Sequence, residues 1–335
     1  MFFILTLKMG VLRHERNPIL KPEGEVKAIF NPAVIEYKKD KILLWSREIT
    51  KELYTLYISR IGLWESEDGT NFRRAVEGYV IEPSEEYERG GCEDPRAVSF
   101  EDGKIYLTYV ALRSPPGYPN YLPPTTALVE IDDPYSKSSY RKIGIITDEK
   151  NNVIINNKDV VLFPERIKGE VLALHRPKSP PAGVNPKNFP SKPSIWIARS
   201  KDMRKWYDFK LLLAPHYEWE NSHIGAGAPP IKTEVGWLCI YHGAGFIDGE
   251  LYYSAGAFLL DLDDPEKVIG RTRKPIWFPE KEYETRGDVN NVIFPTAVIR
   301  RENNLFIYAG LADKYIGVGV IPLEELLREI KKENY

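Results

Sequence analysis

Short apolar runs recur along the chain at a nearly constant interval. Five of them start near residues 31, 94, 158, 228 and 294, so that successive starts lie 63 to 70 residues apart. After a polar turn, each run is followed by a second one rich in β-branched and aromatic residues, as Lys41–Trp45 follows Asn31–Ile35. Two such runs joined by a turn predict a β-hairpin.

Further strand-like segments follow the hairpins, for example Tyr54–Ile61 and Thr126–Ile131. Four short strands per unit and five units predict an all-β fold, a five-bladed β-propeller that occupies residues 1–335 as a single domain. The alternative, a two-domain β-sandwich, does not explain the constant interval. Only Leu323–Lys332 has a clear 3.6-residue apolar period, which predicts a short C-terminal helix.

Composition narrows the class of protein. The chain has 46 Lys and Arg against 48 Asp and Glu, so no basic excess favours a nucleic-acid partner. Two cysteines, Cys92 and Cys239, are too few for a disulfide framework. The apolar start Met1–Leu7 is too short to span a membrane and lacks the features of a secretory signal, which predicts a cytoplasmic protein. Met9 is an alternative start.

The chain contains no glutamine, whereas Glu, Lys and Pro are plentiful. Thermophilic proteins avoid thermolabile amides and favour ion pairs. The composition therefore favours a thermophilic source, which concerns stability and not chemistry.

In a propeller, the first strand of each inner hairpin begins, and the second ends, at the same end of the central channel, because the two strands are antiparallel. Polar or ionisable residues occupy most of these strand ends, where apolar residues would be ordinary. They are Asn31, Ser46, Arg47, Asp94, Tyr109, Arg113, Lys158, His175, Arg176, Tyr241, His242, Asn291, Tyr308 and Asp313. This concentration predicts a functional site at one mouth of the channel.

Asp94 stands in the segment Gly90-Gly-Cys-Glu-Asp-Pro-Arg96. The glycines allow a ligand to approach the backbone, and the proline restricts the residue after the acid. The alternative is that Asp94 only caps a turn. We favour Asp94 as a site residue, because matching the runs of the neighbouring blades places the polar residues Asn31 and Lys158 at the equivalent position. Glu93 is expected to be structural.

Four cations from blades two and three, Arg113, Lys158, His175 and Arg176, are expected at the same mouth. Arginine and lysine together suit a phosphate group. The alternative is a structural network in which they pair with Glu93, Asp94 and Asp159. The sequence has no nucleotide-binding loop and no metal-ligand spacing, so neither a cofactor nor a metal is expected.

Two segments, Ser66–Phe72 and Ser200–Trp206, are similar to the aspartate-box turns of sugar-acting propellers. Such turns lie at the outer edges of blades, and we expect them to be structural. Aromatic residues are abundant, and Trp45, Tyr109 and Tyr241 are expected near the channel, where aromatic faces suit sugar rings.

Several motifs together resemble glycoside hydrolase family 130, the inverting β-mannoside phosphorylases on five-bladed propellers. They occur in the family's order and are Arg16–Ile19, Phe30–Ala33, Gly91–Arg96, Asn157–Asp159 with Leu162–Glu165, Leu174–Pro177, Gly225–Pro230, Tyr241–Gly243, Gly287–Asn291 with Phe294–Pro295, and Ala312–Asp313. Asn290 departs from the proline expected there.

The resemblance implies that Asp94 is the general acid, which passes its proton through the 3-hydroxyl of the mannosyl unit. It implies phosphate binding by Arg113, Lys158, His175 and Arg176. The expected sugar-binding residues are Asn31, Ser46, Arg47, Tyr109, Tyr241, His242, Asp288, Asn291 and Asp313.

The expected reaction is phosphorolysis of β-1,4-linked mannosides to α-mannose 1-phosphate and a shortened acceptor, with inorganic phosphate as co-substrate. The expected substrates are mannooligosaccharides or mannosides linked to glucose or N-acetylglucosamine. One alternative is an inverting β-mannoside hydrolase, which needs a second carboxylate to activate water. Another is a non-catalytic carbohydrate-binding propeller. The loops Ser114–Pro124 and Lys178–Pro193 are expected to decide which acceptor is bound, and a homo-oligomer is expected from the resemblance.

Overall fold

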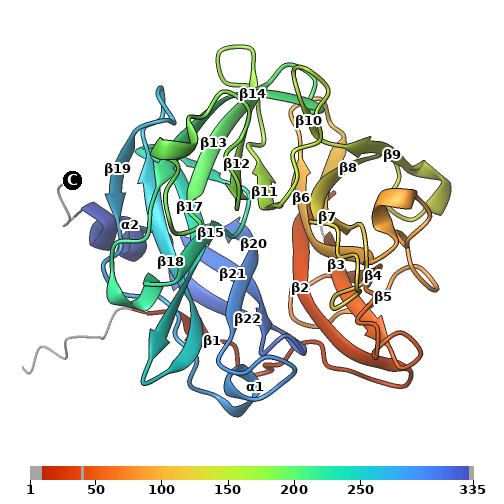
Figure 1. Cartoon of the computed structure of the whole chain (residues 1–335). Helices are drawn as coiled ribbons and strands as arrows, with labels where there is room; N and C mark the ends of the chain where they lie inside the picture. The colour runs from red at the N-terminus through yellow and green to blue at the C-terminus, as the bar shows by residue number, and fades with distance from the viewer. Residues whose placement is uncertain (1–9, 39–40, 332–335) are drawn as a thin grey trace, which may run out of the picture.

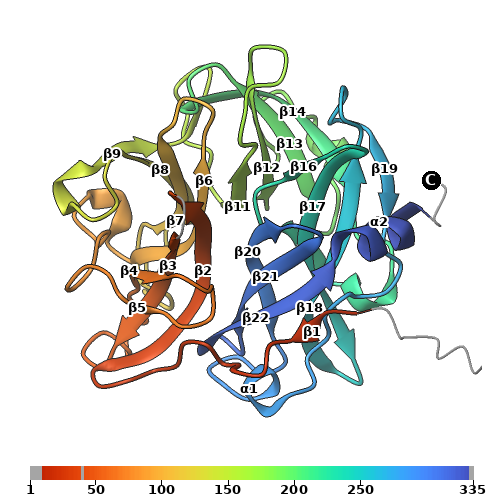
Figure 2. The same cartoon turned by 180° about the vertical axis from the view of Figure 1, so that it is seen from behind.

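Five sheets stand around a common centre in the computed structural model, which describes residues 10–38 and 41–331 (Figures 1 and 2). Each sheet is one blade, and the predicted five-bladed propeller is confirmed. Strands within a blade are antiparallel, apart from the short parallel pairing of β10 with β14. No helix among the described residues is long and apolar enough to cross a membrane.

Four strands make up the basic blade, and the first of them lies innermost. Blades one and two consist of β2 (Val26–Tyr37), β3 (Lys41–Thr50), β4 (Arg60–Ser66), β5 (Arg73–Arg74), and β6 (Gly91–Ser99), β7 (Ile105–Leu112), β8 (Thr125–Ile131), β9 (Tyr140–Ile145). Blade three consists of β11 (Asn157–Leu162), β12 (Val171–Pro177), β13 (Ile195–Ser200), β14 (Lys205–Leu213) and β10 (Thr147–Asp148).

Blades four and five vary this plan. Blade four consists of β15 (His223–Ala226), β16 (Ile231–Thr233), β17 (Gly236–Ile247), β18 (Glu250–Leu260) and β19 (Val268–Arg271). Its inner strand β15 lies just before residue 228, where the apolar pattern predicts it. The pattern misses β15 because this strand contains glycine and alanine where the other inner strands have β-branched residues. Blade five consists of β20 (Ile293–Arg301), β21 (Asn304–Leu311), β22 (Tyr315–Pro322) and the N-terminal β1 (Leu12–Arg13).

The ring is closed by β1, which pairs with β22 so that Leu12 lies opposite Val320. The first described strand of the chain thus completes the last blade. The C-terminal helix α2 (Leu323–Lys331) confirms the predicted one, and it buries Leu323, Leu326 and Ile330 against blades four and five. The helix α1 (Glu282–Thr285) is a single turn before β20.

Hydrophobic contacts between adjacent blades form the core. One cluster joins blades one and two through Trp45, Leu63 and Leu107, and another joins blades five and one through Ile29, Ile42 and Val318. The two aspartate-box segments are turns at outer blade edges, as expected. Asp68 accepts backbone N–H groups from Thr70 and Asn71, and Asp202 accepts them from Arg204 and Lys205.

A buried glutamate recurs in three blades at a single helical turn before the inner strand. Glu88, Glu220 and Glu284 are each fully buried, and each accepts backbone N–H groups or an aromatic donor together with a cation from the outermost strand. In blade five the cation is Arg13 of β1, whose Nε lies 2.6 Å from Glu284 Oε1. This ion pair ties the closing strand to the ring.

Replacing Glu284 by alanine is expected to lower the free energy of unfolding by about 2–4 kcal/mol, because it leaves Arg13 and two backbone N–H groups without their acceptor. Urea unfolding followed by fluorescence measures the change. Glu282→Ala is the matched control, since Glu282 lies on the same turn with its side chain 82% exposed, and its change should stay within about 0.5 kcal/mol. Equal stability of the two variants would contradict the proposed tie.

Candidate functional site

A cavity of about 200 Å³ lies at the centre of the ring, and residues from all five blades line it. They are Asn31, Arg47, Asp94, Lys158, Asp159, Arg176, Tyr253, Val289, Val292, Phe294 and Asp313. Seven of them are ionisable or amide side chains, which is unusual for the centre of a fold. The expected concentration of polar groups at the channel is therefore present.

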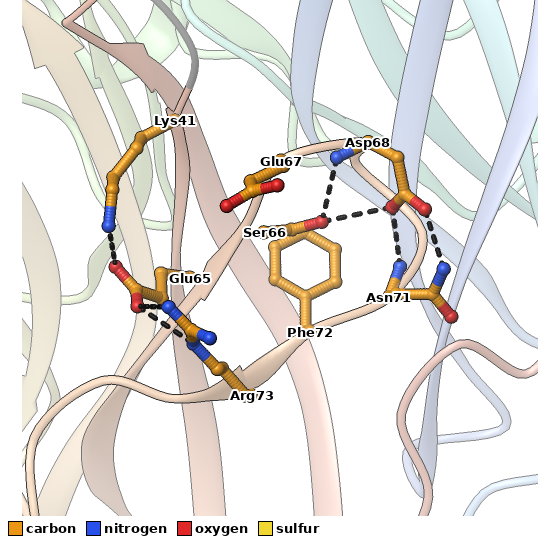
Figure 3. A pocket seen from close by; sticks show the side chains of 8 residues that line it. All are labelled: Lys41, Glu65, Ser66, Glu67, Asp68, Asn71, Phe72 and Arg73. Atoms are coloured by element: carbon orange, nitrogen blue, oxygen red, sulfur yellow. Dashed lines mark hydrogen bonds and ion pairs between the residues drawn. The ribbon is translucent and has the colours of Figure 1, made fainter.

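A second hollow, of about 430 Å³, lies at the outer edge of blade one (Figure 3). Most of its charges are paired with one another: Glu65 accepts hydrogen bonds from Lys41 and Arg73, and Asp68 holds its own turn. The remaining carboxylate, Glu67, is exposed at the surface. The central cavity is the candidate site.

A bulge in each of three inner strands directs a polar side chain into this cavity. Asn31, Asp94 and Asp159 have φ of 46°, 48° and 56°, in the left-handed region, and at each the pairing of first and second strand shifts by one residue. Asparagine and aspartate tolerate this conformation better than most residues. The repeated bulge explains why these short side chains occur here.

The bulges correct one feature of the sequence alignment. Asp159, not Lys158, occupies the position in blade three that Asn31 and Asp94 occupy in blades one and two. The apolar residues that define the first runs of blades one, two and three do not show where a bulge inserts an extra residue. The preference of Asp and Asn for positive φ would have been the better guide.

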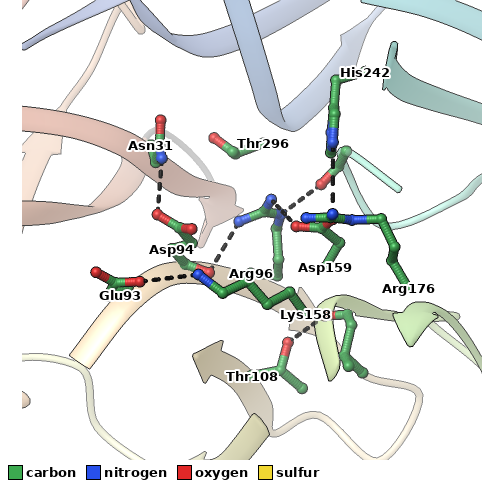
Figure 4. Close-up of polar contacts among 12 residues, drawn as sticks. Asn31, Glu93, Asp94, Arg96, Thr108, Lys158, Asp159, Arg176, His242 and Thr296 are labelled. Atoms are coloured by element: carbon green, nitrogen blue, oxygen red, sulfur yellow. Dashed lines mark hydrogen bonds and ion pairs between the residues drawn. The ribbon is translucent and has the colours of Figure 1, made fainter. Parts of the chain in front are cut away.

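Asp94 lies within hydrogen-bond distance of two partners from blade one. Its Oδ1 accepts from Asn31 Nδ2 at 2.8 Å and from Arg47 Nη1 at 2.9 Å (Figure 4 shows the former). Burial alone would raise the pKa of this carboxyl, but the charges of Arg47, Lys158 and Arg96 and the amide of Asn31 together lower it. Asp94 is therefore a carboxylate when the cavity is empty.

Arg96, two residues after Asp94, contacts several blades around the channel. Its Nε donates to the carbonyl of Gly227 in blade four at 2.6 Å, and its Nη1 donates to the carbonyl of Asp94 at 2.9 Å. The guanidinium packs on the ring of Phe294 in blade five, 5.5 Å from its centroid. Its Nη2 is buried without a hydrogen bond, 3.9 Å from Asp159 Oδ1. Arg96 thus links blade two to blades three, four and five next to the cavity.

Cations gather on the side of the cavity formed by blade three. Arg176 Nε donates to Asp159 Oδ2, and Lys158 Nζ lies 3.4 Å from Glu93 Oε2 (Figure 4). Burial lowers the pKa of the nearby Lys178, and the charges of Arg176 and Lys158 lower it further. The cations are thus close enough to repel one another, and an anion bound among them would relieve that repulsion.

Asp313 faces the cavity from the turn between β21 and β22. Burial raises its pKa to about 7, with Asp94, Glu93 and Asp288 adding to the rise and Arg47 opposing it. The sequence analysis assigned no second carboxylate beside Asp94 that could activate water. The structure places one in the same cavity.

Asp313→Asn is expected to stabilise the protein at pH 8. The pKa of Asp313 is higher in the folded chain than in the unfolded chain, so ionising this carboxyl above pH 7 costs folding free energy. Asparagine removes that cost, and we expect a gain on the order of 1–3 kcal/mol at pH 8 that shrinks to nothing below about pH 4. Urea unfolding of both proteins at the two pH values measures it. A gain of the same size at pH 4 would argue against the titration.

Other predicted site residues lie beside the cavity. His242 is fully buried, with Nε2 3.8 Å from Asp159 Oδ2. Asp288 accepts from Lys314 at 3.2 Å, and Asn291 donates to Glu250 at 3.2 Å. Arg113 follows β7, half-buried, and is not among the residues that line the cavity. Its role as a phosphate ligand stays a prediction.

Four predicted residues point away from the cavity. Ser46 donates to Glu48, Tyr109 to Glu88 and Tyr241 to Glu220, all within or between blades. His175 contacts Asn157 Oδ1 at 3.0 Å, and burial lowers its pKa to about 3, so it is neutral.

Strand geometry accounts for this division. Successive side chains on a regular strand point to opposite faces, so only one member of each neighbouring pair on the second strands β3 and β12 reaches the channel. Arg47 and Arg176 reach it, whereas Ser46 and His175 do not.

Several cavity residues were not predicted. Glu93, expected to be structural, is buried and bonded to both Arg47 and Lys158. The aromatic residues Tyr253 and Phe294 line the cavity from blades four and five. The alternative, a network of cations with acidic side chains, is present for Lys158 with Glu93 and for Arg176 with Asp159. Both cations also line the cavity, so the network does not exclude a binding site.

The family model described as "beta-1,4-mannooligosaccharide phosphorylase" matches residues 7–332. The chain belongs to glycoside hydrolase family 130. The resemblance found in the sequence is thus confirmed. The relatives are named as phosphorylases, which agrees with the expected glycoside phosphorylase.

Relatives of this family-130 protein differ in the linkage for which they are named. A 1,2-beta-oligomannan phosphorylase of Thermoanaerobacter sp. (strain X514) is 36% identical, over 92% of this chain and 96% of its own. A beta-1,4-mannooligosaccharide phosphorylase of Ruminococcus albus is 28% identical, over 97% and 92%. Among solved structures, the Listeria innocua beta-1,2-mannobiose phosphorylase in complex with beta-1,2-mannobiose has a TM-score of 0.78 at 28% identity, covering 97% of this chain and 100% of that one.

Proposed function

We propose that this protein cleaves β-linked mannosides with inorganic phosphate and releases α-mannose 1-phosphate with inversion. The observation that supports this most directly is the position of the buried Asp94 carboxyl in one cavity with the blade-three cations Lys158 and Arg176. Phosphate is already a nucleophile and needs cations to hold it rather than a base to activate it.

The parts of the cavity have distinct proposed roles. Asp94 supplies the proton for the leaving oxygen through the 3-hydroxyl of the mannosyl unit. Lys158 and Arg176 hold phosphate, and Asn31, Arg47 and Asp313 bind sugar hydroxyls. The aromatic rings of Tyr253 and Phe294 supply apolar surface for the sugar face, and the Phe294 ring also packs against Arg96. Inorganic phosphate is the proposed co-substrate, with no further cofactor.

For the linkage, we propose β-1,2-mannosides in place of the β-1,4-mannosides expected from sequence. Two Thermoanaerobacter phosphorylases named for β-1,2-linked mannosides are each 36% identical to this chain, against 28% for the β-1,4 enzyme. Mannosides linked to glucose or N-acetylglucosamine remain proposed alternative substrates.

The experiment incubates the protein with β-1,2- or β-1,4-mannobiose over a series of phosphate concentrations. Mannose 1-phosphate and free mannose are both quantified, and the product anomer is assigned by NMR. We expect mannose 1-phosphate in amounts that depend on phosphate, faster from the β-1,2 disaccharide. Free mannose alone at every phosphate concentration would identify a hydrolase with Asp313 as candidate base. Binding without turnover would identify a carbohydrate-binding propeller.

A further inference from the structure

Four charged side chains form a continuous series from the cation cluster to the acid. Lys158 Nζ lies 3.4 Å from Glu93 Oε2, Glu93 Oε1 accepts from Arg47 Nη2, and Arg47 Nη1 donates to Asp94 Oδ1 at 2.9 Å. The charges alternate in sign along the series, which comes from blades three, two, one and two in turn. Glu93 therefore shares Arg47 with Asp94 and also holds Lys158 (Figure 4 shows Glu93, Asp94 and Lys158).

Lys158 is the looser end of this series. Its side chain is 27% exposed, against 9% or less for Glu93, Arg47 and Asp94, and it lines the cavity. Its contact with Glu93 is the longest of the three. A lysine ammonium on a flexible stem can turn towards an incoming anion more easily than the buried arginine can.

A general acid must carry a proton, whereas the cations around Asp94 lower its pKa and favour the carboxylate. The groups that face it are the amide of Asn31 from β2, Arg47 from β3, Arg96 from β6, Lys158 from β11 and Asp313 from the β21–β22 turn. Of these, Lys158 is a proposed phosphate ligand. Something must therefore weaken the cationic hold on Asp94 before the reaction.

We infer that Glu93 is a positioning residue that transmits anion binding to the acid. An anion that draws Lys158 away leaves Glu93 with Arg47 as its remaining cation. Arg47 then binds Glu93 more closely and Asp94 less closely, and Asp94 takes a proton from solvent. Phosphate thus prepares the acid that will act with it. This inference rests on the proposed function, since it assumes that the cations bind phosphate.

Proton uptake on anion binding tests the inference directly. Sulfate is the first probe because it carries no proton to exchange near neutrality, and inorganic phosphate is the second. The heat of binding is measured by titration calorimetry at pH 7.5 in buffers of different ionisation enthalpy, whose slope gives the protons taken up. We expect the wild-type protein to take up a measurable fraction of a proton per anion.

Two variants identify the group that is protonated. Asp94→Asn should bind the anion without proton uptake, and Asp313→Asn should retain it. Uptake that survives in Asp94→Asn and disappears in Asp313→Asn would overturn the inference. Anion binding by the wild type without any uptake would overturn it too, while leaving the proposed function in place. If neither sulfate nor phosphate binds, the proposed phosphate site itself is contradicted.

Glu93→Gln separates positioning from a merely structural role. It keeps the shape of the side chain but frees Lys158 from its carboxylate and leaves Arg47 to Asp94 alone. We expect phosphate to bind several-fold more tightly, kcat to fall at least tenfold at neutral pH, and kcat to recover partly at lower pH. Proton uptake on sulfate binding should fall by at least half.

Glu220→Gln is the matched control, since Glu220 is a buried carboxylate paired with Arg271 outside the cavity. It should lower thermal stability without tighter phosphate binding or a shifted pH profile. If Glu93→Gln behaves as this control does, Glu93 is structural and the inference fails.

Discussion

Asp94→Asn is expected to remove nearly all phosphorolysis while leaving the fold intact. The change deletes the proposed proton donor, and general acid catalysis contributes on the order of 10²–10⁴ in rate. The chain itself shows that asparagine fits this conformation, because Asn31 occupies the equivalent bulge in blade one with φ of 46°. Initial rates with mannobiose and phosphate, together with a thermal melt, measure both parts of the expectation.

The outcome that contradicts the assignment of Asp94 is simple to recognise. A folded variant that keeps more than about a tenth of wild-type turnover cannot have lost its general acid. In that case Asp313, a carboxyl of the same cavity whose pKa burial raises to about 7, would be the next residue to replace.

Lys158→Ala is expected to raise the KM for phosphate at least tenfold, and much more than the KM for the mannoside. The change removes a charged hydrogen-bond donor to the nucleophile, and losing such a bond costs about 1.5–3 kcal/mol. The measurement is initial rate against phosphate concentration at saturating mannobiose. The control is Lys232→Ala, since Lys232 is an exposed cation that pairs with Glu165 away from the cavity.

Arg176→Ala belongs in the same series as Lys158→Ala. Arg176 lines the cavity but is bound to Asp159, so its loss also leaves a buried carboxylate without its main partner. The KM for phosphate should rise, and stability should fall as well. If neither Lys158→Ala nor Arg176→Ala raises the KM for phosphate more than the KM for the mannoside, the blade-three cations do not form the phosphate site.

The five-bladed fold could be predicted because its signal is repetition. The interval of 63 to 70 residues is visible in apolar runs such as that beginning at Asn31, and the runs near residues 31, 94, 158 and 294 lie in the inner strands β2, β6, β11 and β20. Blade four was located imprecisely because β15 is formed by His223-Ile-Gly-Ala226, which has few strand-forming residues. There the pairing with β17, rather than local propensity, decides the structure.

The site could be predicted less completely than the fold. The candidates from the sequence include Asn31, Arg47, Asp94, Lys158 and Arg176, and these five side chains line one cavity. Which of two neighbouring residues faces the channel depends on the bulges, and an apolar pattern does not reveal them. Glu93 was therefore read as structural, although its carboxylate lies between Arg47 and Lys158.

The closing strand has a consequence for the order in which the enzyme becomes active. β1 is synthesised before the five inner strands, but its partner β22 is about 300 residues further along the chain, so the two can pair only after the strands of the last blade have been made. The same late segment carries Asp313, and the carbonyl of Lys314 beside it accepts the backbone N–H of Ile29 in blade one. A nascent chain with four finished blades would therefore hold Asp94 and its cations but no complete cavity. Catalytic competence should arise abruptly with the last blade, which makes turnover a direct reporter of ring closure.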